Sequence, residues 1–167
     1  MDSHLARLKE TIASATHGMN EEDLTRHPEG KWSVAEILEH LYLSYTGTVK
    51  GFERCMAAGK PLATSSSLGQ RVKALYVVEI GKFPPGRKAP KNTEPRGIAS
   101  EKIFADIGPQ IVAMDEAITK CEERYGKKIK LLDHPILGPF TARQWRKFHW
   151  VHGRHHVKQI LRLRGRN

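Results

Sequence analysis

The sequence predicts an all-α protein that folds as a four-helix bundle, with one extra short helix and a long basic loop rich in proline and glycine. Four long segments repeat apolar residues at spacings of three and four, which is the pattern of a helix with one buried face. Good N-capping residues precede two of these segments, and strands are hard to find anywhere. A chain of 167 residues is expected to form one domain, residues 1–167.

The first helix is expected over residues 2–17, and Gly18 ends it. A polar connector is expected after it. The apolar face of this helix consists of Leu5, Leu8, Ile12 and Ala15.

The second helix is longer and is expected over residues 33–58. Ser33 is a good N-cap and Glu36 completes a capping box, while Gly59 and Pro61 close the helix. Its apolar face consists of Val34, Ile37, Leu38, Leu41, Tyr45 and Phe52.

A shorter helix is expected over residues 66–80, followed by the basic loop at residues 81–97. The loop contains four prolines, three glycines and five basic residues, which predicts a mobile segment that borders a site. The apolar pattern of the short helix consists of Leu68, Val72, Leu75 and either Val77 or Val78.

Two more helices complete the predicted bundle. One runs over residues 100–126, where Pro109 is expected to bend the helix or to start it. The last runs over residues 142–163, with Thr141 as N-cap and Gln144 as capping-box partner. Its inward stripe is Trp145, Phe148 or His149, His152, His156, Gln159 or Ile160, and Leu163, among which Trp145 is expected in the core.

The net charge of +10 is uneven, because residues 1–60 hold 7 basic and 9 acidic residues and residues 61–167 hold 21 and 9. The excess favours a solvated cationic face or attraction for a small anionic substrate. Nucleic acid is a weaker reading, since the cations are not interleaved with aromatic residues. Two distant cysteines, Cys55 and Cys121, and the lack of a signal peptide or membrane span predict a cytoplasmic protein without a membrane partner. The sequence does not decide between a monomer and a homodimer.

Histidines on the last predicted helix are the main functional signal. His152 and His156 are four residues apart, so their Cβ atoms lie about 6 Å apart on one face, close enough to share a metal ion. His40 is the best third ligand. The pairs His152–His155 and His149–His152 compete, but the inward stripe favours His152 with His156. His155 then falls on the helix flank and His149 becomes a second-shell or pocket residue. A buried pair without metal is the plainer alternative.

The segments WSVAEILEH and HPILGPFTARQWRKFHWVHGRHHVKQI resemble the DinB/YfiT-like superfamily, in its branch with the HPxxG…W…HxxHHxxQ ending. The resemblance covers about residues 30–160. It implies an up-down-down-up four-helix bundle that binds zinc, nickel or a similar divalent ion. It implies His40, His152 and His156 as the ligands, whereas residues 61–99 match no feature of that superfamily.

Three neutral imidazoles with an open fourth position would lower the pKa of a bound water towards roughly 7, which predicts a metal-dependent hydrolase. The resemblance adds a second chemistry, thiol S-transfer with a low-molecular-weight thiol as cofactor. Near the site, Gln159 is expected to hydrogen-bond a ligand or to pack between helices. His134 is expected to brace a tight turn, although it and Asp133 are also within reach of the site. A non-catalytic metal-binding or stress-associated bundle is the alternative function, and a nucleic-acid-associated protein is the third.

Overall fold

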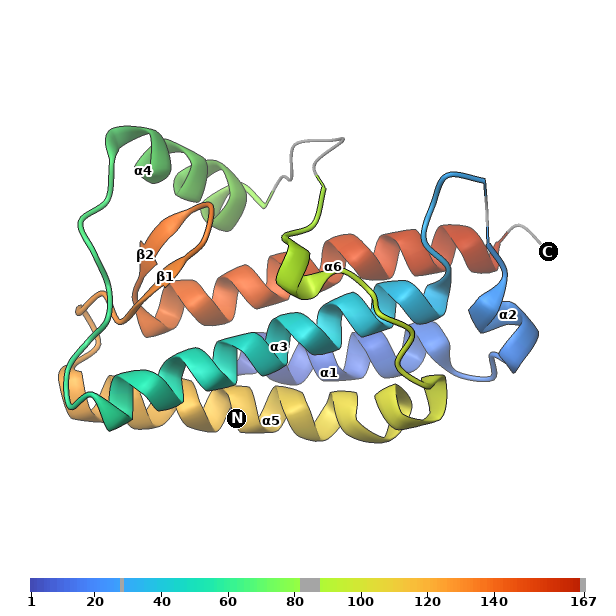
Figure 1. The fold of residues 1–167 in the computed structure, drawn as a ribbon, viewed down its shortest axis with the longest axis horizontal. Helices are drawn as coiled ribbons and strands as arrows, with labels where there is room; N and C mark the ends of the chain where they lie inside the picture. Colours follow the sequence, from blue (N-terminus) through green and yellow to red (C-terminus); the bar gives the residue numbers. More distant parts are fainter. Residues whose placement is uncertain (28, 82–87, 166–167) are drawn as a thin grey trace.

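The computed structural model describes residues 1–27, 29–81 and 88–165, and shows a mostly helical protein with one small sheet (Figure 1). Among the described residues, no helix is long and apolar enough to cross a membrane. The elements are α1 (Ser3–Thr16), α2 (Glu21–Thr25), α3 (Val34–Ala57), α4 (Leu68–Ala74), the π-helical turn η1 (Leu75–Glu79), the 3-10 turn η2 (Lys91–Thr93), α5 (Ser100–Tyr125), β1 (Leu132–His134), β2 (Gly138–Phe140) and α6 (Ala142–Arg164).

The four long helices, α1, α3, α5 and α6, lie side by side along the long axis of the molecule (Figure 1). The closest pairs are α3 with α5 and α1 with α6. The short helix α4 stands apart from this group (Figure 1), and η2 contacts α3. Segments far apart in the sequence, α3 and α6, also contact each other.

The predicted helix starts are confirmed by their caps. Ser33 Oγ accepts the N–H of Glu36, and the Glu36 carboxylate accepts the N–H of Ser33 at 2.8 Å. The same reciprocal bonds join Thr141 to Gln144 at the start of α6. These bonds satisfy backbone donors that have no partner within a helix, and so they define where α3 and α6 begin.

The sequence analysis missed the short helix α2, the 3-10 turn η2 and the hairpin of β1 and β2. The polar connector contains α2, which is capped by Asn20 and buries Leu24. The sequence pattern did not indicate strands, but residues 132–134 and 138–140 form an antiparallel hairpin in which Leu132 pairs with Phe140. Strands of three residues are too short to show an alternating pattern, and this hides them from sequence analysis.

Pro109 lies inside α5 and does not start it, since the helix runs without a break from Ser100 to Tyr125. The apolar pattern of the short helix also differs from a buried face. Val77 and Val78 are buried, but most of the other apolar side chains face outward. The exposed residues, with their exposed fractions, are Leu68 (78%), Val72 (61%), Leu75 (57%), Tyr76 (42%) and Ile80 (57%).

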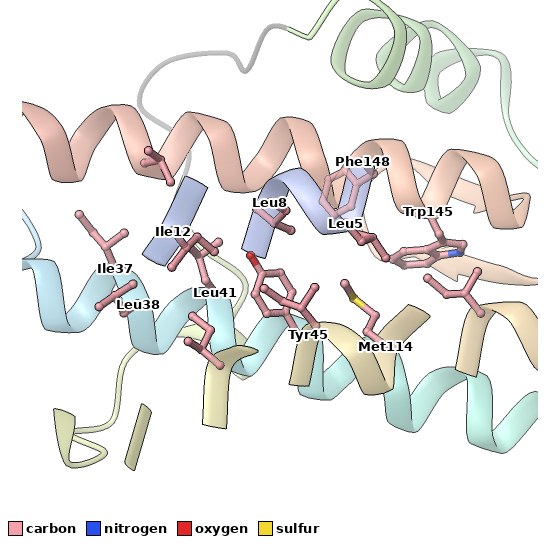
Figure 2. Packing of buried hydrophobic residues seen from close by; sticks show 14 of the residues in the cluster. Leu5, Leu8, Ile12, Ile37, Leu38, Leu41, Tyr45, Met114, Trp145 and Phe148 are labelled. Atoms are coloured by element: carbon pink, nitrogen blue, oxygen red, sulfur yellow. The ribbon is translucent and has the colours of Figure 1, made fainter. Parts of the chain in front are cut away.

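The core is built where the apolar faces of the long helices meet. Figure 2 shows side chains from α1, α3, α5 and α6 packing together, with Tyr45 and Met114 between the helices and Trp145 at one end. Gly153 allows α1 and α6 to approach, because a Cβ atom at this position would lie 2.1 Å from Cδ1 of Leu8. This packing sets the position of α6 relative to α3, and so the position of the histidines that both helices carry.

Candidate metal centre

His40 on α3 and His152 and His156 on α6 form one buried group. Their exposed fractions are only 4%, 9% and 8%. The Nε2 atom of His152 lies 3.1 Å from Nε2 of His40 and 3.1 Å from Nε2 of His156. The three ligand atoms lie within 4.8 Å of one another, so this group could hold a metal ion.

The second ring nitrogen of two of these histidines is held by an acceptor. Nδ1 of His40 lies 2.8 Å from the backbone oxygen of Thr93, and Nδ1 of His156 lies 2.8 Å from Oε1 of Gln159. Both oxygens only accept hydrogen bonds, so each Nδ1 carries the proton and each Nε2 presents a lone pair. The lone pairs of His40 and His156 are therefore directed towards the same place, next to Nε2 of His152.

This arrangement of donors fits a divalent transition metal. Three nitrogens bound at about 2.0–2.1 Å to a tetrahedral zinc ion lie about 3.3 Å from one another. The two separations that involve Nε2 of His152, both 3.1 Å, are close to this value. Imidazole nitrogen suits zinc, copper, nickel and iron, and an oxygen acceptor on the far ring nitrogen is the usual support for a ligating histidine. The contacts of His40 and His156 have both properties.

Burial keeps the three imidazoles neutral. It lowers the pKa of His40, against the opposing effect of the hydrogen bond to Thr93. Burial, and then the neighbouring histidines, lower the pKa of His152 well below its usual value. For His156, burial and then His40 lower the pKa to about 3. Neutral imidazole is the form that binds metal, so these side chains are ready to act as ligands at neutral pH.

A carboxylate next to His40 positions the acceptor of that histidine. Glu39 is only 2% exposed, and its two oxygens accept the backbone N–H groups of Arg96 at 2.6 Å and of Gly97 at 3.1 Å. These bonds hold the segment after η2 against α3, which places the carbonyl of Thr93 over His40. Glu39 therefore holds the backbone of Arg96 and Gly97 and is not available as a proton acceptor at the metal centre.

Of the expected loop at residues 81–97, residues 82–87 lie outside the described residues. The described part borders the site as predicted, and it contains the single turn η2. Thr93 in this turn is buried, so this part of the segment is tied to the fold.

His149 and Trp145 lie beneath the three-His group on the same helix. His149 is 1% exposed, and its Nε2 lies 3.0 Å from Oγ1 of Thr48. The Thr48 hydroxyl donates to the carbonyl of Ser44, so it accepts the proton of His149 Nε2. Trp145 is buried as predicted and donates from Nε1 to the carbonyl of Leu132. His149 thus links α6 to α3 by a buried hydrogen bond.

His134 lies outside the ligand group. Its Nδ1 accepts the N–H groups of Ile136 and Leu137, both at 3.2 Å, which is the predicted bracing of the turn between β1 and β2. Its ring centroid lies 4.5 Å from that of Phe148, and burial lowers its pKa to about 4. Asp133 also points elsewhere, since it accepts from the backbone N–H and the hydroxyl of Thr64.

His155 is connected to the three-His group through Gln159. The amide nitrogen of Gln159 lies 3.3 Å from Nε2 of His155, while its oxygen binds His156. His155 is partly exposed and lines the cleft that opens above the group. Gln159 thus lies between the ligand candidate His156 and the partly exposed imidazole of His155.

A cleft of about 1330 Å³ leads to the three-His group. Its walls come from α3, α6, the hairpin, the segment 68–79 and the residues around η2. All three histidines line it, so a small molecule in the cleft can reach the ligand atoms.

The chain matches, over residues 1–162, the model of the family described as "Protein of unknown function (DUF1569)". It belongs to this family. A relative, "Uncharacterized protein YuaE" of Bacillus subtilis (strain 168), is 25% identical over 158 residues, which cover 88% of this chain and 86% of YuaE. No solved structure was found to match the chain.

Two functional residues of this DUF1569 chain were missed by sequence reasoning. Thr93 acts through its backbone oxygen, and no residue type marks a backbone acceptor. For Glu39 the sequence does contain a signal. Glu39 lies between Leu38 and His40, in a stretch of α3 that is buried on several sides. A carboxylate in such a place needs hydrogen-bond donors.

Proposed function

We propose that the protein is a divalent-metal-binding bundle of the DinB-like type that acts as a metal-dependent enzyme, either a hydrolase or a thiol S-transferase. Zinc and nickel are the proposed ions, with His40, His152 and His156 as ligands. The observation that carries this proposal is the convergence of the three Nε2 atoms, two of them with lone pairs set by their Nδ1 partners.

The helix order supports the DinB-like part of the proposal. One candidate ligand comes from α3, the second long helix, and two come from α6, the last one, as the resemblance implies. The pairing of α3 with α5 and of α1 with α6 is compatible with an up-down-down-up bundle. The free, buried thiols of Cys55 and Cys121 are in keeping with the cytoplasm, the compartment that we propose.

When bound, a divalent ion with three imidazole ligands supplies Lewis acidity and lowers the pKa of a water or thiol ligand. The chain contributes a neutral ligand set, a cleft that admits substrate and a titratable group at its wall, His155. Glu39 accepts two backbone N–H groups, and Nε2 of His155 contacts the amide nitrogen of Gln159, so proton transfer is assigned to neither residue. Hydrolysis requires a base that activates water, whereas thiol transfer does not. Thiol transfer therefore requires fewer catalytic groups from these residues than hydrolysis does.

The decisive experiment is elemental analysis of the untagged protein beside three variants. We expect about one equivalent of transition metal per chain, lost in His40→Ala and in His152→Ala, both still helical by circular dichroism. The matched control is His17→Ala, because His17 is exposed and does not belong to the three-His group. A wild-type protein that neither contains metal nor takes it up on titration would refute the proposal. Confirmed binding would be followed by assays of ester hydrolysis and of thiol transfer to an electrophile.

A further inference from the structure

One wall of the cleft is apolar. Val72 and Tyr76 line it and remain largely exposed, while Val77 in the same segment is buried. Ile136 of the hairpin turn and Phe148 of α6 line the cleft as well. Exposed apolar side chains that continue into a cleft mark a surface that binds an apolar group.

Cations dominate the polar part of the cleft. Three carboxylates also line it, but two of them already have partners: Glu36 binds the N–H of Ser33 and pairs with His27, and Asp133 binds Thr64. Only Glu94 has no such contact within the described residues. The cationic side chains, for which no ion pair is found in the described part of the chain, are Lys31, Arg54, Lys73, Lys88 and Arg162. The cleft therefore attracts anions.

Two of these cations, Lys31 and Arg162, lie on the other side of the three-His group from Phe148, whereas Lys73 adjoins Val72 on α4 and Arg54 is in the last turn of α3. Phe148 comes one helical turn before His152 on α6, and its ring stacks on the His152 ring with centroids 5.4 Å apart. Arg162 lies beyond His156 on the same helix and lines the other end of the cleft. Lys31 belongs to that end too, because it precedes Trp32, whose ring centroid is 5.1 Å from that of His40.

We propose that the cleft binds an amphiphilic organic anion, with its apolar body between Tyr76 and Phe148 and its acidic group near Lys31 and Arg162. The reacting part of such a molecule lies beside the three-His group, which is between the two ends. This inference rests on the proposed function for the role of the histidines, but the binding itself depends only on the cleft.

The test uses three probes with eight carbon atoms each, octanoate, octan-1-ol and octylammonium, and acetate as a fourth, short probe. Binding is measured by calorimetry at one ionic strength, first to chelator-treated protein and then after addition of zinc. We expect octanoate to bind at least tenfold more tightly than octan-1-ol. Octylammonium and acetate are expected to show no saturable binding, since the first has the wrong charge and the second lacks the apolar body.

Variants separate the two ends of the cleft. Lys31→Gln and Arg162→Gln are each expected to weaken octanoate binding about three- to tenfold and to leave octan-1-ol unchanged. Tyr76→Ser is expected to weaken both probes. The matched control is Lys158→Gln, because Lys158 is exposed on α6 and does not line the cleft, and it should change neither affinity.

Octylammonium binding as tight as octanoate, or equal losses in Lys158→Gln and Arg162→Gln, would overturn the inference. The outcome is separable from that of the metal analysis. A protein that binds octanoate without taking up metal refutes the proposed function alone, and a protein that takes up metal but fails to bind octanoate refutes this inference alone.

Discussion

Nδ1 of His40 donates to the backbone oxygen of Thr93 at 2.8 Å, across 53 positions of the sequence. This contact joins the second long helix to a segment without regular structure on either side of a single 3-10 turn. It holds the imidazole in one tautomer and one orientation, and it depends on the Glu39 carboxylate that holds Arg96 and Gly97. The orientation of His40 therefore depends on residues that lie outside α3 and α6, the two helices that carry the ligand candidates.

Glu39→Gln tests this dependence. The amide nitrogen of glutamine cannot accept a hydrogen bond, so Arg96 or Gly97 loses its acceptor and the Thr93 carbonyl shifts away from His40. We expect zinc affinity to fall about 10–100-fold, as measured by competition with a chromophoric chelator. Glu53→Gln, an exposed change on the same helix, should have no effect. Unchanged affinity in a folded Glu39→Gln protein would show that Glu39 does not position the ligand.

Gln159 is predicted to support His156 in the same way. Gln159→Leu removes the acceptor of the His156 Nδ1 proton, and about tenfold weaker zinc binding is expected. Gln159→Glu keeps an acceptor at this place and should retain the affinity. Equal losses in both variants would indicate that Gln159 matters for packing instead.

His134 is predicted to make stability depend on pH. Burial lowers its pKa to about 4 in the folded protein, against 6.5 for a histidine exposed to water. Between these values the unfolded chain binds more protons, so the stability from neutral His134 is complete above pH 6.5 and is lost as pH falls towards 4. In His134→Asn, whose side-chain oxygen can still accept from Ile136 and Leu137, the slope of the unfolding free energy against pH should decrease by up to about 1.4 kcal/mol per pH unit. Urea unfolding of the metal-free protein at several pH values measures it, and identical slopes would contradict the prediction.

Gly153→Ala should destabilise the contact between α1 and α6. The new Cβ would lie 2.1 Å from Cδ1 of Leu8, which is fully buried, and overpacking of this kind costs about 1–3 kcal/mol. Gly47→Ala is the control, since nothing lies within 4 Å of a Cβ at that position of α3. The double variant Gly153→Ala with Leu8→Ala should be more stable than the sum of the single changes predicts. Strict additivity, measured by urea unfolding, would exclude the clash.

The long helices and the pair of His152 and His156 were predictable because both follow from local spacing, whereas His40 was chosen from its place on the second long helix and from the resemblance. Ser33 with Glu36 defined the start of α3, and the four-residue interval placed His152 and His156 on one face. The hairpin at residues 132–140 was not predictable, because each strand has only three residues. The exposure of Leu68 and Leu75 was not predictable either. Periodicity identifies the apolar face of a helix, but it does not tell whether that face is packed against the core.

The two helices that supply the ligand candidates are far apart in the sequence, with His40 and His152 separated by 112 positions. An ion bound there would be held only by the folded chain, because unfolding separates the ligands. By mass action such an ion stabilises the fold by about 2.7 kcal/mol when its free concentration is 100 times its dissociation constant. Metal supply would then govern how long each molecule survives proteolysis, so a cell short of the ion would hold less of the protein as well as less of its activity.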